Sequence, residues 1–539
     1  MSIGNRYSDH SFARVPSAEI PRSTFDRSHS VKTTFDTGYL VPIFRDLAYP
    51  GDTFHVDATL FARLSATALA RPIMDNLYLD TFFFAVPIRQ IWTNFQKFMG
   101  EQDNPGDSTS YSIPQMTSPG GGAGIATGDV GDHLGLPTKT ANAITFNSLW
   151  HRAYSWIWNN WFRDQNMQNS VTVDKGDGPD NYATYSSLLR RGKRHDYFTS
   201  CLPWPQKATA VSIPLGTSAV VKTQATDTVT GAQAAMRWLD KNGSSVSANR
   251  YLMTDASGRL TGYATTGPTQ AGAELYPSNL YADLSTATAA TINSLRLAFQ
   301  LQKLYERDAR GGTRYTEIIK AHFGVISPDA RLQRPEYLGG GSMPINIHPV
   351  AGTTQTGSGA TAPGQLSAFG TAAGRGHGFS KSFVEHCVVI GLANVRADLS
   401  YWQGIDRMFS YRTRTDMFFP VLSMIGEQAV LNKEIYADGS ANDDLVFGYQ
   451  ERYAEMRYKP SLITGKFRSN ATGTLDSWHL AQNFASLPTL NSTFIADTPP
   501  VSRVVAVTTE PQIILDGFFK FIAARPLPVY GVPGNIDRF

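Results

Sequence analysis

The chain has 539 residues, of which 42% are apolar, and its 48 Lys and Arg residues face 45 Asp and Glu residues, for a formal net charge of +3 at pH 7. A charge so close to zero excludes a histone-like polycation, and the apolar fraction excludes a disordered chain. Only 17% of the residues are charged whereas 12% are aromatic, which predicts that other subunits cover much of the surface.

Residues 1–35 are predicted to form an extended arm without a core of its own. Pro16 and Pro21 interrupt any helical period, and basic residues outnumber acidic ones in this stretch. The N-terminus lacks the apolar region of a signal peptide, and no stretch approaches the length of a membrane helix, so we expect folding in a cytoplasm without membrane insertion. From 33 to 64 and from 75 to 88, β-branched and aromatic residues predict sheet strands.

A glycine-rich loop at 100–140 precedes a segment with helical periodicity. Trp150, Tyr154, Trp158 and Trp161 recur at spacings that place them on one helical face. A stripe of large rings is far more often a packing surface than a cofactor site. We therefore expect these four residues to lie in the core or at a subunit contact.

The strongest basic cluster is LLRRGKRHDYF, in which Arg190, Arg191, Lys193 and Arg194 precede two aromatic residues. Interleaved cations and rings suit the phosphates and stacked bases of a single strand. An arginine network that binds neighbouring loops or subunits would have the same composition. With so small a net charge, the sequence leaves both interpretations open.

Residues 208–286 are dominated by Thr, Ala, Ser and Gly, and their five basic residues balance five acidic ones, which predicts a neutral, separately folded insertion. Helical patterns follow at 285–311, with Ser285 as N-cap, and at 315–323. Beyond residue 340, we expect glycine-rich loops between short apolar strands such as 383–395, 501–509 and 512–529. Widely separated strands with helices in the loops predict a mainly β sandwich with insertions.

The sequence contains none of the common enzyme signatures. GxxxxGK[ST], HExxH and GxSxG are missing, and Cys201 and Cys387 are too far apart to suggest a zinc site. Glu385 and His386 are best read as a core pair, and the oxygen-bearing residues at 438–444 as a solvated turn, because the remaining calcium ligands are missing. We therefore predict no catalytic residue, no metal and no cofactor.

Long peptide blocks nearly throughout the chain carry a resemblance to a known family. They include RSTFDRSHSVKTTFDTGYLVPIFRD, RAYSWIWNNWFRDQN, RRGKRHDYFTSCLPWPQK, RLQRPEYLGGGS and VFGYQERYAEMRYKPS. In these blocks the chain resembles the major capsid protein of the gokushovirus branch of the Microviridae, small bacteriophages with circular single-stranded DNA. The sequence departs from the family at 100–140, 208–286 and 350–378, which leaves the bacterial host and its receptor open.

The resemblance implies an eight-stranded antiparallel jelly roll with long loop insertions that contain several helices. Residues 36–207 and 287–539 would form the jelly roll with its helical and glycine-rich loops, and 208–286 would form a protrusion at the threefold axes. That protrusion would expose Arg237, Trp238, Tyr251 and Tyr263. Copies would assemble into a T=1 icosahedral shell, a virion component built in the bacterial host cytoplasm.

The implied partners are other copies, the single-stranded DNA genome, and the small basic DNA-packaging, internal scaffolding and DNA pilot proteins of the phage. A host receptor, such as a cell-surface glycan, would bind the protrusion. Shell proteins meet a genome in every register, so we expect DNA contacts without base reading. The candidates are Arg6, Arg14, Arg22, Arg27, Arg190, Arg191, Lys193 and Arg194. The competing function is a jelly-roll carbohydrate-binding or hydrolytic protein, which would need an aromatic platform or paired carboxylates.

Overall fold

The computed structural model of the chain describes residues 21–207, 211, 220–223, 238–240, 251–254, 260–263, 273–277, 280–283, 292–353 and 364–530. Clustering of contacts divides the chain into two compact units, one made of Met1–Pro205 with Asp308–Phe539 and the other of Gln206–Arg307. Among the described residues, no helix is both long and apolar enough to cross a membrane.

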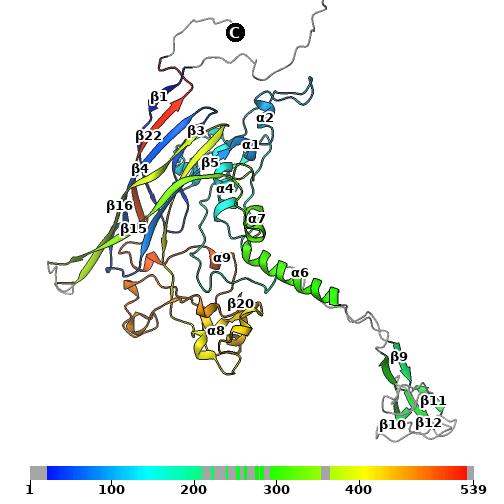
Figure 1. Cartoon of the computed structure of the whole chain (residues 1–539). Helices are drawn as coiled ribbons and strands as arrows, with labels where there is room; N and C mark the ends of the chain where they lie inside the picture. Colours follow the sequence, from blue (N-terminus) through cyan, green and yellow to red (C-terminus); the bar gives the residue numbers. More distant parts are fainter. Residues whose placement is uncertain are drawn as a thin grey trace, which may run out of the picture. The chain divides into compact units, whose positions relative to one another are not determined.

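The first unit is built around one large antiparallel sheet. Its strands are β1 (Ser23–Asp26), β2 (His29–Phe35), β3 (Val41–Ala48), β4 (Thr53–Leu69), β5 (Leu77–Pro87), β15 (Glu336–Ala351), β16 (Leu366–Ser382), β17 (Cys387–Ala397) and β22 (Ile513–Arg525). They pair in the order β1-β22-β4-β16-β15-β5-β17-β3 (Figure 1). Strands β1 and β2 both pair with β22, one after the other along its length. Because β1 and β2 share one place, the sheet has eight positions, which confirms the predicted jelly roll.

The core lies between the two halves of this curled sheet, β1/β2-β22-β4-β16 and β15-β5-β17-β3. Buried and less buried side chains alternate along β22, as a strand with one face toward a core requires. Rings from both halves meet there, with Phe44 5.4 Å from Phe519 and Phe83 5.4 Å from Phe379 between ring centroids. Each buried ring contributes about 1.5–3 kcal/mol of apolar burial.

The prediction of glycine-rich loops beyond residue 340 is wrong, because β15 and β16 are long sheet strands. A Cβ atom on Gly378 would lie 1.9 Å from the carbonyl oxygen of Val56, and one on Gly340 would lie 2.0 Å from that of Thr81. The register also shifts between Tyr337 and Gly339. The glycines therefore mark close backbone approach and bulges inside strands.

A layer of short helices covers the outer face of β5 and β17 (Figure 1). These elements are α1 (Ile88–Ile91), α2 (Phe95–Phe98), α3 (Val130–His133), α4 (Leu149–Ile157), a π turn at Trp158–Phe162 and α5 (Tyr182–Tyr185), with a small sheet of β6 (Gln115–Thr117), β7 (Thr145–Asn147) and β8 (Asp180–Asn181). Val389 and Val395 of β17 face the sandwich core, whereas Val388 and Ile390 face the helices. β17 is therefore apolar on both faces, as strands covered on both sides must be.

Residues 398–512 add a lobe of short elements to the first unit. They are β18 (Ser400–Tyr401) with β21 (Ser461–Leu462), β19 (Glu427–Leu431) with β20 (Val446–Glu451), α8 (Asn432–Ile435), α9 (Ser492–Ile495), and 3-10 turns at Arg407–Ser410, Pro420–Met424, Ala441–Asp444, Ala454–Met456, Gly465–Phe467, Asp476–Trp478 and Val501–Arg503. The expected strand at 501–509 is therefore wrong. Two prolines, Pro499 and Pro500, lead into a turn instead.

The second unit contains two small sheets. One has the order β10 (Trp238–Asp240), β13 (Ala273–Pro277), β12 (Leu260–Tyr263), β11 (Tyr251–Thr254), and the other pairs β14 (Leu280–Asp283) with β9 (Val220–Thr223). Helix α6 (Ile292–Gly311) begins in this unit and ends in the first. Helix α7 (Tyr315–Phe323) follows and ends at Gly324, which has a left-handed conformation. The expected N-cap Ser285 lies outside the described residues.

Candidate nucleic-acid interface

A broad depression of about 1020 Å³ opens on the first unit beside the predicted basic cluster. Its wall includes eight Lys and Arg residues and only two carboxylates. The cations are Arg163, Arg191, Lys193, Arg194, Arg310, Arg314, Lys320 and Arg396, and the carboxylates are Asp164 and Glu317. Three further carboxylates outside the wall, Asp80, Asp398 and Glu427, pair with four of these cations. The depression therefore carries a moderate excess of positive charge, although the whole chain is nearly neutral.

The basic segment is held in an extended conformation by single backbone bridges on both sides. Arg191 N donates to Gly38 O at 2.9 Å, and Lys193 N donates to Ile495 O at 2.8 Å. Arg191, Lys193 and Arg194 line the depression, whereas Arg190 does not.

Arg191 and Arg396 share one carboxylate at the back of the depression. Asp80 Oδ2 lies 2.6 Å from Arg191 Nη1 and 3.3 Å from Arg396 Nη2. Burial, together with the neighbouring charge of Arg396, lowers the pKa of Arg191 to about 10, so Arg191 stays charged at neutral pH. Asp497 is a second carboxylate whose charge acts on both guanidinium groups.

Lys193 and Asp497 are buried charged groups of the cluster. Lys193 is 7% exposed, donates to Gln482 Oε1 at 3.1 Å and lies 4.5 Å from the centroid of the Phe494 ring. Burial lowers the pKa of Lys193 to about 8. Burial also raises the pKa of Asp497 to about 6, although nearby cations oppose that change. Lys193 and Asp497 therefore both stay mostly charged near pH 7, and Asp497 offsets part of the positive charge of the cluster.

The other two predicted cations contact parts of the same chain. Arg190 lies 3.9 Å above the Tyr39 ring and donates to Asp497 O at 2.9 Å. Arg194 pairs with Asp398 at 3.1 Å and lies 4.5 Å from the Tyr78 ring centroid. These contacts favour the arginine-network interpretation for Arg190 and Arg194, and DNA contact by any of the four cations stays a prediction.

An aromatic wall borders the cations. The ring centroids of Trp161 and Phe84 lie 5.4 Å apart, those of Trp161 and Tyr337 5.9 Å, and those of Phe82 and Phe162 5.2 Å. Phe84 is buried and Arg334 lies 4.2 Å from the centroid of the Trp161 ring, whereas Tyr337 is 42% exposed. Cations beside an exposed ring are the combination that binds single-stranded nucleic acid. Sequence reasoning missed the distant contributors Arg310, Arg314, Lys320 and Arg396, although ERDARGGTRYTEII is itself rich in arginine.

The predicted aromatic helix face is divided between core and depression. Tyr154 and Trp158 are buried, and each donates a hydrogen bond at 2.8 Å, to Leu40 O and Arg190 O respectively. Burial raises the pKa of Tyr154 above its ordinary value. Trp150 and Trp161 are half-buried, and Trp161 lines the depression.

The remaining predicted residues lie in other parts of the chain. Arg22 is exposed and donates to Thr53, and Arg27 pairs with Asp46, whereas Arg6 and Arg14 lie outside the described residues. Because β1 and β2 pair with β22, the predicted arm is a sheet edge from residue 23 onward.

Of the four residues predicted for the protrusion, three lie in described strands of the second unit. Trp238 begins β10, and Tyr251 and Tyr263 are paired in β11 and β12, whereas Arg237 lies outside the described residues. Their exposure on a protrusion stays a prediction.

The two cysteines and the Glu385–His386 pair, for which we predicted structural roles, lie at buried or half-buried positions. Cys201 and Cys387 are free and buried. His386 is half-buried and contacts the rings of Tyr49 and Phe95, so it is not the core residue that was expected, and Glu385 pairs with Arg89. Within the described ranges, no group of three or more His, Cys, Asp or Glu residues is placed to hold a metal ion.

Comparison with known proteins gives consistent matches over the whole chain. The family model described as capsid protein (F protein) matches residues 13–535. The capsid protein VP1 of Bdellovibrio phage phiMH2K is 47% identical over 543 residues and covers 100% of both chains. Those of Chlamydia phage 1 and Spiroplasma virus 4 are 43% and 37% identical, with 97% of each chain covered in both cases.

Proposed function

We propose a shell-forming function, because this chain belongs to the capsid protein (F protein) family and is a gokushovirus-type capsid protein of the Microviridae. Its copies close into a T=1 icosahedral shell around circular single-stranded DNA. The match from residue 13 to residue 535 leaves little of the chain for any other domain. The protein is a structural component of the virion. We propose that it has no catalytic activity and that assembly takes place in the host cytoplasm with the scaffolding, DNA-packaging and DNA pilot proteins.

The basic depression is the proposed contact with the packaged genome. The observation that carries this proposal is a wall of eight cations beside aromatic rings, in which the two lining carboxylates and the outer carboxylates Asp80, Asp398 and Glu427 are too few to neutralise all the cations. Phosphates would lie against the cations while bases stack on an exposed ring such as Tyr337, which requires no particular base sequence. The ion pairs with Asp80 hold the guanidinium groups in place before DNA arrives, so little side-chain entropy is lost on binding.

Charge reversal at Lys320 tests this contact, because the side chain is exposed and lines the depression. The affinity of the purified full-length subunit for a single-stranded oligonucleotide would be measured over a range of salt concentrations. Lys320→Glu should weaken binding to all sequences alike. It should also reduce the slope of log affinity against log salt concentration by about 0.7 for each phosphate that the subunit no longer neutralises. Lys520→Glu, which reverses an exposed charge of β22 outside the depression, is the matched control. Equal salt slopes for the two variants would argue against the depression as the DNA site.

The second unit is the proposed region of host attachment. Its receptor-contact candidates are Trp238, Tyr251 and Tyr263, together with Arg237. Its separation as a compact unit with sheets of its own supports this role. A deletion that joins Lys207 to Thr288 through a Gly/Ser linker should leave the jelly roll folded, because the cost of loop closure changes slowly with length. Particles that form but no longer adsorb to host cells would support attachment. Unchanged adsorption would contradict it, and a chain that cannot fold would show that the segment belongs to the core.

A further inference from the structure

Residues 405–425, here called the apolar lobe, expose an unusual number of large apolar side chains. Phe409 is 77% exposed, Val421 90% and Met424 94%. Ile405, Met408, Met417, Phe418 and Ile425 are also exposed. Large apolar side chains exposed together in one short segment often mark a place where another molecule binds.

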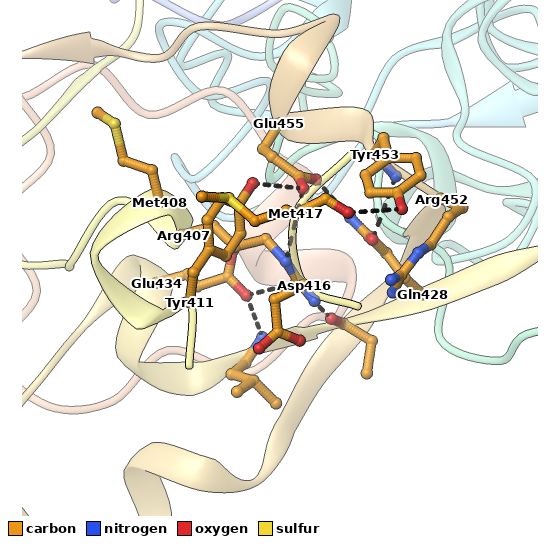
Figure 2. Close-up of polar contacts among 12 residues, drawn as sticks. Arg407, Met408, Tyr411, Asp416, Met417, Gln428, Glu434, Arg452, Tyr453 and Glu455 are labelled. Atoms are coloured by element: carbon orange, nitrogen blue, oxygen red, sulfur yellow. Dashed lines mark hydrogen bonds and ion pairs between the residues drawn. The ribbon is translucent and has the colours of Figure 1, made fainter. Parts of the chain in front are cut away.

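A buried polar network holds the base of the apolar lobe in one conformation (Figure 2). Arg407 Nη1 lies 2.9 Å from Glu434 Oε1 and donates to Ala429 O at 2.7 Å. Glu455 accepts from Tyr411 at 3.0 Å and from Gln428 at 2.6 Å. The lobe is therefore attached to β19, to α8 and to the turn at Ala454–Met456 through side chains with little exposure.

The tip of the apolar lobe is also fixed by hydrogen bonds. Asp416 Oδ2 accepts from the backbone N–H groups of Arg412 at 2.9 Å and Thr413 at 2.7 Å. Tyr453 Oη donates to Met417 O at 3.1 Å, as Figure 2 shows for the labelled pair. The exposed side chains are thus displayed by a built structure. A surface that is organised before binding loses less entropy when a partner docks.

The chemistry of the apolar lobe suits a protein partner better than nucleic acid. Val421, Met424 and Ile425 have no aromatic face on which a base could stack. The exposed cations Arg412 and Arg414 lie within the lobe, and Arg414 lies 5.4 Å from the Phe419 ring centroid. The partner surface should therefore combine apolar side chains with acidic ones.

Residues 99–107 of this chain offer exposed acidic side chains beside one large apolar residue. Met99 is 51% exposed, and Glu101 and Asp103 close to it are also exposed. Between Lys97 and Lys139 the sequence has five acidic residues and no further Lys or Arg. We propose that the apolar lobe of one copy docks on residues 99–107 of a neighbouring copy. Contacts between two different patches of identical chains are the kind that build closed shells.

This inference rests on the proposed shell function, so the test includes the unchanged protein. The full chain would be coexpressed with the internal scaffolding protein of the phage, and particles would be counted by electron microscopy. Val421→Ser with Met424→Ser should lower the particle yield about tenfold or more. The serine side chains would bury much less apolar area in the subunit contact than valine and methionine do. Val421→Ile with Met424→Leu keeps the apolar surface and should assemble normally. The thermal unfolding of all subunits should be equal, because these side chains are outside the core.

Charge reversal tests the choice of partner surface. Arg412→Glu with Arg414→Glu, and separately Glu101→Lys with Asp103→Lys, should each reduce assembly, and the chain that combines all four changes should recover it. Normal particles from the serine variant, or no recovery in the combined chain, would overturn the inference. Serine variants that assemble but lose affinity for single-stranded DNA would also overturn it, in favour of a nucleic-acid contact. No shells from the unchanged chain would count against the proposed function instead.

Discussion

Arg152 and Asp180 form a bidentate ion pair in which both N–O distances are 2.6 Å and neither side chain is exposed. Arg152 also donates to Ile91 O at 3.0 Å and to Gly176 O at 2.9 Å. One guanidinium group therefore joins α4, the end of α1 and the segment that leads to β8. It fixes the helical layer that carries Trp161 to the depression.

Loss of this ion pair should strongly destabilise the subunit. Asp180→Asn leaves a buried guanidinium group without its countercharge, so we expect the free energy of unfolding to fall by about 3–5 kcal/mol in denaturant titrations. Asp516→Asn breaks an exposed ion pair in which the side chain of Asp516 is 48% exposed and that of Lys32 is 73% exposed. This substitution should change the free energy of unfolding by less than about 1 kcal/mol. Equal effects of the two substitutions would show that Arg152 has no structural role of this kind.

Trp158 should behave as a core residue. It is 6% exposed, and its indole N–H donates to Arg190 O, so Trp158→Ala should lower the free energy of unfolding by about 3–5 kcal/mol. Trp150→Ala, at a half-buried position of the same helix, should cost less. A Trp158→Ala subunit that folds normally but does not assemble would place this ring at a subunit contact instead.

His151 should make the folded subunit sensitive to acid. Burial lowers the pKa of His151 from 6.5 to about 4. The folded state then resists protonation while the unfolded state takes up a proton, so stability that is present above pH 6.5 is lost as the pH falls toward 4. This loss amounts to about 3 kcal/mol.

His151→Phe should remove that part of the pH dependence and keep the ring contacts with Phe146 and Tyr182. The measurement is the free energy of unfolding at several pH values between 4 and 7. His55→Phe, a change at an exposed histidine, serves as the control. A parallel pH dependence in the unchanged chain and the His151→Phe variant would contradict the prediction.

Gly378 should not tolerate even a methyl group. The Cβ atom of Gly378→Ala would lie 1.9 Å from Val56 O in the neighbouring strand, so β16 and β4 could not keep their register. We expect insoluble or strongly destabilised protein. Gly106→Ala, at a position where nothing lies within 4 Å of the new atom, should express as the unchanged chain does. Soluble Gly378→Ala protein with an unchanged melting temperature would contradict this account of the glycine-rich strands.

Periodicity and residue type predicted β3 to β5, β17, β22, α4 and α7, because local apolar patterns determine these elements. The strands β1 and β2 lie in the stretch that was predicted as an extended arm. The prediction of loops at β15 and β16 failed for a physical reason. Glycine is needed at positions 340 and 378 because the backbone of a neighbouring strand passes close by, and no local sequence pattern reveals that contact. The same limit applies to the depression. Arg191 was identified inside its cluster, whereas Arg314 and Arg396 reach the same wall only through the fold.

The most direct test of the account is a cryo-electron microscopy reconstruction of particles produced with the scaffolding and DNA-packaging proteins. We predict a T=1 shell with each basic depression facing the interior and density for single-stranded DNA between Lys320 and Tyr337. Soluble subunits that never close into a shell, or a shell whose depressions face outward with no DNA beside them, would contradict the account.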